Sequence, residues 1–112
     1  MVLYTITIIR YGILNHMRAR QLFRYKDRQG DITVEMVIWQ LPRAAEERPL
    51  GLKYRLYCGR DGDCIVRYDI EAGKDDHRHY GARQEAYRFI SLESLVADFR
   101  EDCARLTGWR WL

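Results

Sequence analysis

Two histidines, His77 and His79, lie two residues apart in a polar segment that also carries Lys74, Asp76 and Arg78. Imidazoles exchange protons near neutral pH, and fixed cations stabilise the negative charge that grows as a phosphodiester is cleaved. In an extended chain His77 and His79 project to the same side about 7 Å apart, twice the rise of a strand. Asp76 would orient one imidazole. These residues predict a phosphodiester-cleaving site that needs no metal.

The same segment has two other interpretations. A His-x-His pair in a strand is a common pair of metal ligands, and Asp75 or Asp76 would add oxygen atoms. A third histidine would have to come from His16, distant in the sequence, so acid–base chemistry ranks above metal binding. The third interpretation is a solvated, charge-rich loop whose histidines make only local contacts. No cofactor or metal is expected.

Size and composition predict one folded domain in the cytoplasm. The chain has 112 residues, of which 47% are hydrophobic and 31% charged, a globular composition. Three cysteines, an odd number without Cys-x-x-Cys spacing, favour reduced thiols over disulfides or zinc. The apolar stretch Val2 to Leu14 contains Arg10 and is too short to span a bilayer, so no membrane association is expected.

The middle of the chain predicts two β-hairpins. The first joins Arg18 to Lys26 with Ile32 to Leu41 through the turn residues between them, and β-branched and aromatic residues favour strands there. The second joins Leu52 to Cys58 with Cys64 to Asp69 through a turn that contains two glycines. Further short strands are expected at Ala86 to Ile90 and at Leu3 to Ile9.

The C-terminal part predicts one amphipathic helix, from about Leu92 to Thr107. Ser91 suits its N-cap and Gly108 its C-cap. Its apolar stripe at three- and four-residue spacing consists of Leu92, Leu95, Val96, Phe99, Cys103 and Leu106. An antiparallel sheet needs cover on its apolar face, and this is the only long amphipathic element. The expected fold is α+β, with an antiparallel sheet of two hairpins and a short last strand, covered on one face by the helix.

The other face of this sheet is expected to be basic. The period of two places basic residues on one side of each strand, namely Arg18, Arg20, Arg24, Lys26, Lys53, Arg55 and Arg67. A surface of this kind binds RNA phosphates, and Tyr25, Tyr54, Tyr57 or Trp39 would stack on unpaired bases. The alternative is that the cations only protect an edge strand from unwanted pairing.

From Met17 onward the chain resembles the TumE family, the toxin components of toxin–antitoxin systems. The resemblance is carried by Val34 to Pro42, Lys53 to Gly62, Tyr68 and Asp69, Gly73 to Gly81, Tyr87 to Phe89 and Leu95 to Phe99. It implies a growth-inhibiting protein neutralised by a helix-turn-helix antitoxin, with which it assembles. Family members begin near Met17, so residues 1–16 are expected to be an extension and residues 17–112 the toxin domain.

Two functions compete on this basis. The first is a metal-independent endoribonuclease, with His77 and His79 in proton transfer, Lys74 and Arg78 on the phosphate, and Asp76 beside a histidine. The second is a binding module that occupies RNA, the ribosome or a protein partner without cleaving anything. A purely structural partner of a DNA-binding protein, without toxicity, is a third hypothesis.

Overall fold

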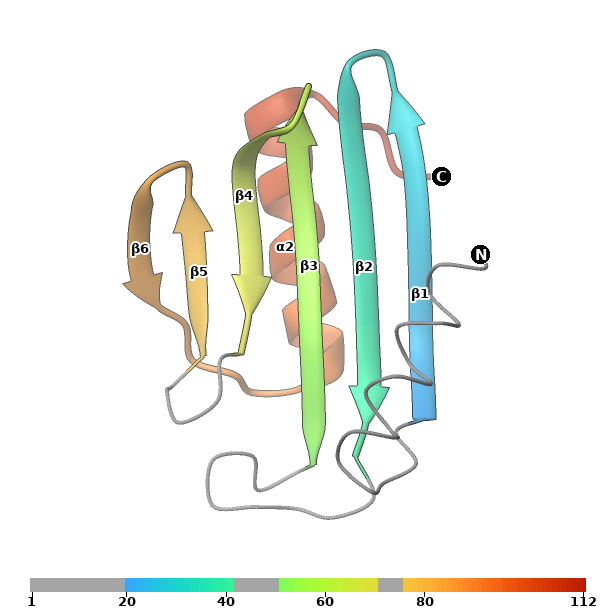
Figure 1. Ribbon diagram of the computed structural model, residues 1–112, viewed down its shortest axis with the longest axis vertical. Helices are drawn as coiled ribbons and strands as arrows, with labels where there is room; N and C mark the ends of the chain where they lie inside the picture. Colours follow the sequence, from blue (N-terminus) through green and yellow to red (C-terminus); the bar gives the residue numbers. More distant parts are fainter. Residues whose placement is uncertain (1–19, 42–50, 71–75) are drawn as a thin grey trace.

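The computed structural model describes residues 20–41, 51–70 and 76–112. Within these ranges six strands form one antiparallel sheet in sequence order, and one helix follows them (Figure 1). The elements are β1 (Arg20–Gln29), β2 (Ile32–Gln40), β3 (Leu52–Arg60), β4 (Asp63–Asp69), β5 (His77–Tyr80), β6 (Arg83–Ala86) and α2 (Leu92–Thr107). The predicted α+β class is confirmed. The strand expected at residues 3–9 lies outside the described residues.

Both predicted hairpins are present. The β3–β4 turn consists of Asp61 and Gly62, whose φ angles are 49° and 90°. Positive φ at both central residues matches the right-handed twist of the flanking strands, and an Asp-Gly pair adopts it at low cost. Strands β2 and β3 pair over their whole length, from Ile32 with Arg60 to Gln40 with Leu52.

The last part of the sheet differs from the prediction, because the histidine segment is itself a strand. Strands β5 and β6 form a third hairpin, whereas the sequence indicated a loop followed by a strand at residues 86–90. Residues 87–90 are not a strand, since their aromatic rings pack into the core instead. Tyr87 lies edge-on to Tyr68 at 4.9 Å, and Phe89 stacks on Tyr54 at 6.0 Å.

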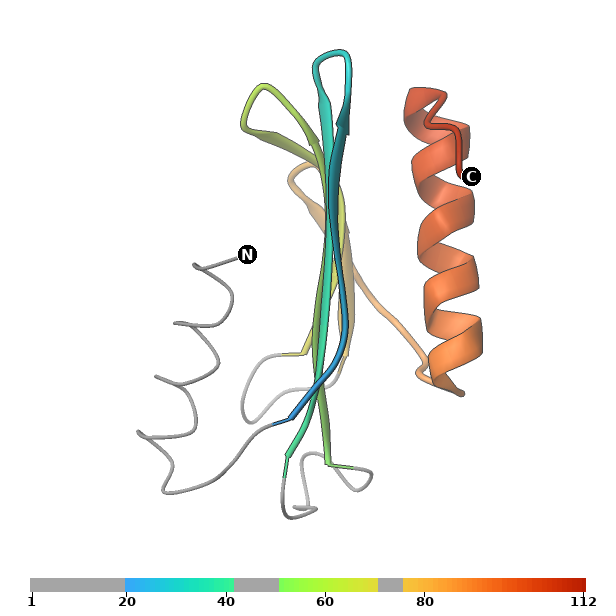
Figure 2. The same ribbon diagram turned by 90° about the vertical axis from the view of Figure 1, so that its right-hand side faces the viewer.

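Helix α2 has the predicted bounds and both predicted caps. Ser91 Oγ accepts a hydrogen bond from Ser94 N at 3.0 Å, which satisfies one free amide of the first turn. Gly108 has a φ of 77°, the left-handed conformation that ends helices, and its amide donates to Ala104 O. The helix lies against one face of the sheet (Figure 2).

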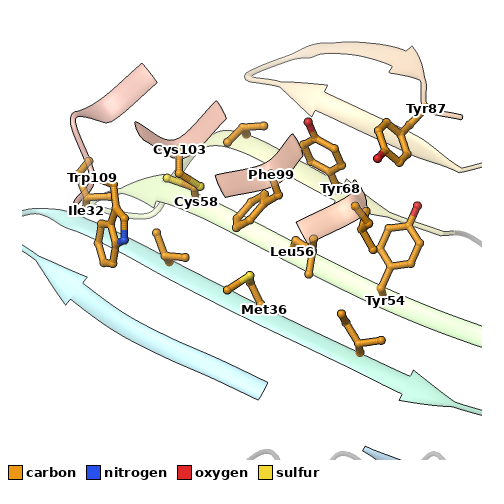
Figure 3. Close-up of a cluster of buried hydrophobic side chains, with 14 residues drawn as sticks. Ile32, Met36, Tyr54, Leu56, Cys58, Tyr68, Tyr87, Phe99, Cys103 and Trp109 are labelled. Atoms are coloured by element: carbon orange, nitrogen blue, oxygen red, sulfur yellow. The ribbon is translucent and has the colours of Figure 1, made fainter. Parts of the chain in front are cut away.

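The core fills the space between α2 and this face. Leu95, Phe99 and Cys103 are fully buried on the helix, and the Phe99 ring meets Tyr68 edge-on at 5.7 Å. The free thiols of Cys58 and Cys103 lie side by side between β3 and α2 (Figure 3). Core side chains come from alternate strand positions, so the intervening residues project to the side away from α2, which we call the open face. Two of these residues on β2, Val37 and Trp39, are nevertheless buried.

A β-bulge divides the basic residues of β1 between the two faces. The register shifts between Gln21 and Phe23, so Arg20 pairs with Gln40 while Arg24 pairs with Val37. Gln40 is in phase with the core residue Ile38, whereas Val37 is on the open face. The prediction that Arg20 shares a side with Arg24 and Lys26 is therefore wrong, because the extra residue reverses the alternation. Arg18 lies outside the described residues.

Candidate functional site

The two histidines of β5 lie together on the open face. Their ring centroids are 6.4 Å apart, and neither residue is fully buried or fully exposed. Alternation along β5 places them on the same side, whereas Arg78 between them projects toward α2. Two imidazoles at this distance can flank a single phosphate group.

Strand β4 supplies a cation and a carboxylate directly opposite the histidines. Its antiparallel register with β5 pairs Arg67 with His79 and Asp69 with His77. Arg67 Nη2 lies 3.2 Å from His79 Nε2. A guanidinium only donates hydrogen bonds, so this contact is a hydrogen bond in the tautomer whose Nε2 carries the lone pair. This lone pair makes His79 a candidate general base.

Asp69 is a residue of the candidate site that the sequence did not single out. Its Oδ1 lies 3.6 Å from His79 Nε2, and its Oδ2 lies 2.8 Å from Arg67 Nε. The latter is a close ion pair in which the N–H is not aligned for a hydrogen bond. The side chains of His79 and Asp69 are only 12% and 14% exposed, so solvent screens the charge of the Asp69 carboxylate weakly. The signal in the sequence was the pattern Arg67-x-Asp69 on a strand before His-x-His.

His77 has a ring nitrogen without a fixed role. Its Nδ1 is buried and has no hydrogen-bond partner among the residues that the structure describes. Buried polar atoms are nearly always paired, and the exceptions call for an explanation. Contacts with the described residues therefore do not fix the tautomer of His77.

Asp76 does not orient a histidine. Its Oδ2 accepts a 2.6 Å hydrogen bond from the hydroxyl of Tyr54, a core residue, and its carbonyl oxygen accepts one from the amide of Tyr87. Burial and the hydrogen bond to Asp76 raise the pKa of Tyr54. Asp76 thus anchors the start of β5 to the core, and Asp69 is the carboxylate that lies 3.6 Å from a histidine ring nitrogen.

Arg78 is separated from the histidines by the sheet. It forms an ion pair with Glu85 at 2.6 Å and donates to the hydroxyl of Tyr68 at 3.3 Å. Burial disfavours the charged form, but these two hydrogen bonds outweigh it and raise the pKa of Arg78. Arg78 therefore contacts the core side and not a phosphate between the histidines. Lys74 lies outside the described residues.

The remaining cations of the open face are partly offset by one carboxylate. Glu35 lies 3.7 Å from Arg55 and 3.9 Å from Lys26. Lys53 Nζ lies 5.8 Å from the centre of the Trp39 ring. Of the seven predicted RNA-binding residues, the open face brings together Arg24, Lys26, Lys53, Arg55 and Arg67.

A comparison with known families assigns the chain. The model of the family described as Toxin TumE matches residues 6–107. The chain belongs to the TumE toxin family. The matched region of this TumE chain contains every described strand and the helix. It also includes part of the segment 1–16 predicted to be an extension, so a domain boundary at Met17 remains a prediction.

Other comparisons add nothing to the TumE assignment. No curated protein and no solved structure matches the chain. Among the described residues, no three His, Cys, Asp or Glu side chains are grouped so that they could hold a metal ion. No described helix is long and apolar enough to cross a membrane.

Proposed function

We propose that this TumE toxin cleaves RNA as a metal-independent endoribonuclease and thereby inhibits growth. One observation carries the proposal: the paired histidines share the open face with Arg67 and Asp69. Acid–base cleavage of RNA needs two groups that exchange protons on either side of a phosphate and a cation beside it. The family assignment supports the toxic role.

In the proposed reaction His79 acts as the general base and His77 as the general acid. His79 Nε2 accepts the proton of a ribose 2′-hydroxyl, and the 2′-oxygen attacks the adjacent phosphorus. The bond from phosphorus to the 5′-oxygen breaks, and His77 in its protonated form donates a proton to that oxygen. The products are a 2′,3′-cyclic phosphate and a 5′-hydroxyl.

Arg67 and Asp69 have complementary roles in this scheme. Arg67 exchanges its contact with His79 for a phosphate oxygen and stabilises the charge of the phosphorane. Asp69 stabilises the imidazolium that His79 becomes, as a carboxylate does beside other catalytic histidines. Lys74, which directly precedes this strand region in the sequence, is a further phosphate ligand in the proposal.

The partner of this toxin is a helix-turn-helix antitoxin that binds and neutralises it. The alternative is a toxin that occupies RNA, the ribosome or a protein without turnover. The low exposure of the His79 side chain, 12%, favours this second function, since a general base must reach its substrate.

Expression of the chain alone separates these functions. The endoribonuclease stops growth and yields RNA fragments with cyclic phosphate or 3′-phosphate ends, and the purified protein cleaves in the presence of a chelator. His77→Ala or His79→Ala lowers cleavage by about 10²- to 10⁴-fold. Gln84 pairs with His79 from β6, and Gln84→Ala is the matched control that is expected to retain activity.

Growth arrest without RNA fragments would favour the binding module. Full toxicity of both histidine variants would reject the acid–base mechanism. Loss of cleavage on chelation alone would instead make the histidines metal ligands.

A further inference from the structure

The ring of Tyr57 lies along the open face over a position that only glycine can occupy. A Cβ atom on Gly59, two residues further along β3, would overlap the Tyr57 hydroxyl, lie 2.6 Å from Tyr57 Cζ and lie 2.7 Å from the backbone oxygen of Asp63. Gly59 has an ordinary φ, so this requirement is one of space and not of backbone conformation. The phenol therefore lies against the strand, with its other side away from the backbone.

A cation flanks the same ring. Arg55 Cζ lies 5.3 Å from the centre of the Tyr57 ring, a cation–π distance. Arg55 is exposed, and Tyr57 is half-buried. An aromatic ring beside an exposed guanidinium on a basic sheet surface is the arrangement that binds unpaired bases and their phosphates.

The cross-strand register connects Tyr57 to the histidine site. Tyr57 pairs with Arg67 on β4, and Arg67 pairs with His79 on β5. Neighbouring strands are about 4.8 Å apart, so the backbones of Tyr57 and His79 are separated by about 10 Å, with Arg67 between them. One nucleotide spans this distance from its phosphate to its base.

The other three aromatic residues that were expected to stack on bases are buried or lie on the other side of the sheet. Tyr25 faces the other side of the sheet, where it packs against Trp111 at 5.5 Å. Tyr54 and Trp39 are buried. Of the four, Tyr57 is the one whose ring lies on the open face beside the site.

We propose that Tyr57 is a stacking platform for one unpaired nucleobase next to the scissile phosphate, with Arg55 on the neighbouring phosphate. The inference rests on the proposed function and deepens it, because it makes single-stranded RNA the substrate. An A-form duplex keeps its bases stacked and cannot place one on the ring. Gly59 is a positioning residue, since it leaves room for the phenol.

Binding of an oligonucleotide that cannot be cleaved tests the platform apart from catalysis. The probe is a fluorescent single-stranded RNA with 2′-O-methyl groups throughout, compared with its duplex by fluorescence anisotropy. Tyr57→Leu is expected to bind the single strand roughly 5- to 100-fold more weakly, the usual cost of one lost base–aromatic stack. Tyr57→Phe and Tyr57→Trp keep a ring and bind within about threefold. Phe23→Ala removes an exposed ring from the other face and is the matched control.

A series of probes with one abasic nucleotide identifies the stacked base. The wild-type chain is expected to bind one probe of the series more weakly than the intact probe. Tyr57→Leu is expected to bind that abasic probe and the intact probe equally. Equal binding by Tyr57→Leu and the wild-type chain, or an equal loss for the duplex, would overturn the platform. Binding with this pattern but without cleavage of ordinary RNA would reject the nuclease and keep the platform. Cleavage of ordinary RNA by Tyr57→Leu with an unchanged KM would keep the nuclease and reject the platform.

Discussion

The carboxylate of Asp69 lies 3.6 Å from His79 Nε2, across the pairing of two neighbouring strands. Asp76, immediately before His77 in the sequence, instead binds a tyrosine of the core. The register of the sheet therefore decides which carboxylate lies near the histidines.

Asp69→Asn is expected to lower RNA cleavage by about tenfold or more, because the imidazolium formed at His79 loses its negative neighbour. Asp76→Asn, the matched variant, should leave the chemical step unchanged and lower stability instead. Single-turnover cleavage rates and denaturant unfolding of both variants provide the measurement. The reverse pattern would return the catalytic role to Asp76.

Substitution of Arg67 should affect RNA cleavage, whereas substitution of Arg78 should affect stability. Arg67→Gln is expected to lose cleavage by about 10²-fold with its fold intact, as on removal of a group that stabilises the transition-state charge. Arg78→Gln should instead lower the free energy of unfolding by about 1–3 kcal/mol, because Glu85 and the Tyr68 hydroxyl lose a charged partner. An Arg78→Gln protein of normal stability without activity would contradict this assignment.

Acid should weaken the packing of α2 on the sheet through Asp102. Burial raises the pKa of this carboxyl, but hydrogen bonds from Tyr68, Tyr80 and Arg105 outweigh burial and leave the pKa below its usual value. The unfolded chain therefore binds this proton more readily than the folded protein. The stabilisation is complete above the unfolded pKa of about 3.9 and is lost as the pH falls through the folded pKa.

Denaturant unfolding between pH 7 and pH 2 measures this effect. Asp102→Ala should cost about 2–4 kcal/mol at pH 7, since two tyrosine hydroxyls lose their acceptor, and should cost less at low pH. Glu101→Gln, exposed on the same helix, is the control. If Asp102→Ala lowered the free energy of unfolding equally at pH 7 and at pH 2, the charge of Asp102 would not be the source of the stabilisation.

Phe99→Ala should lower the free energy of unfolding by roughly 3–5 kcal/mol, the usual cost of deleting a fully buried aromatic ring. Leu106 belongs to the same predicted stripe but is 38% exposed, so Leu106→Ala should cost about 1 kcal/mol or less. Denaturant midpoints compare the two variants. Similar losses for both would mean that the helix packs by another face.

A chain that begins at Met17 should fold, because every described strand and α2 lie after residue 19. Thermal unfolding followed by circular dichroism compares it with the full chain. A cooperative transition only in the full chain would show that residues 1–16, part of which the TumE family match includes, are integral to the domain.

The sequence alone determined the elements that depend on local patterns. The period of the apolar residues, Ser91 and Gly108 predicted α2 to the residue, because helix caps are local hydrogen bonds and conformations. The glycines between Cys58 and Cys64 predicted the second hairpin for the same reason. The residues Lys53 to Gly62 and Gly73 to Gly81 also identified the toxin family.

Only the tertiary structure decided which side chains meet. The bulge near Leu22, invisible in the pattern of β1, moved Arg20 to the other face. The apparent loop became β5 because β4 and β6 offered it backbone partners on both sides. Pairing with β4 then placed Asp69 and Arg67 beside the histidines and turned Arg78 toward the core. Strand register joins residues that are distant in the sequence, so no local pattern reveals it.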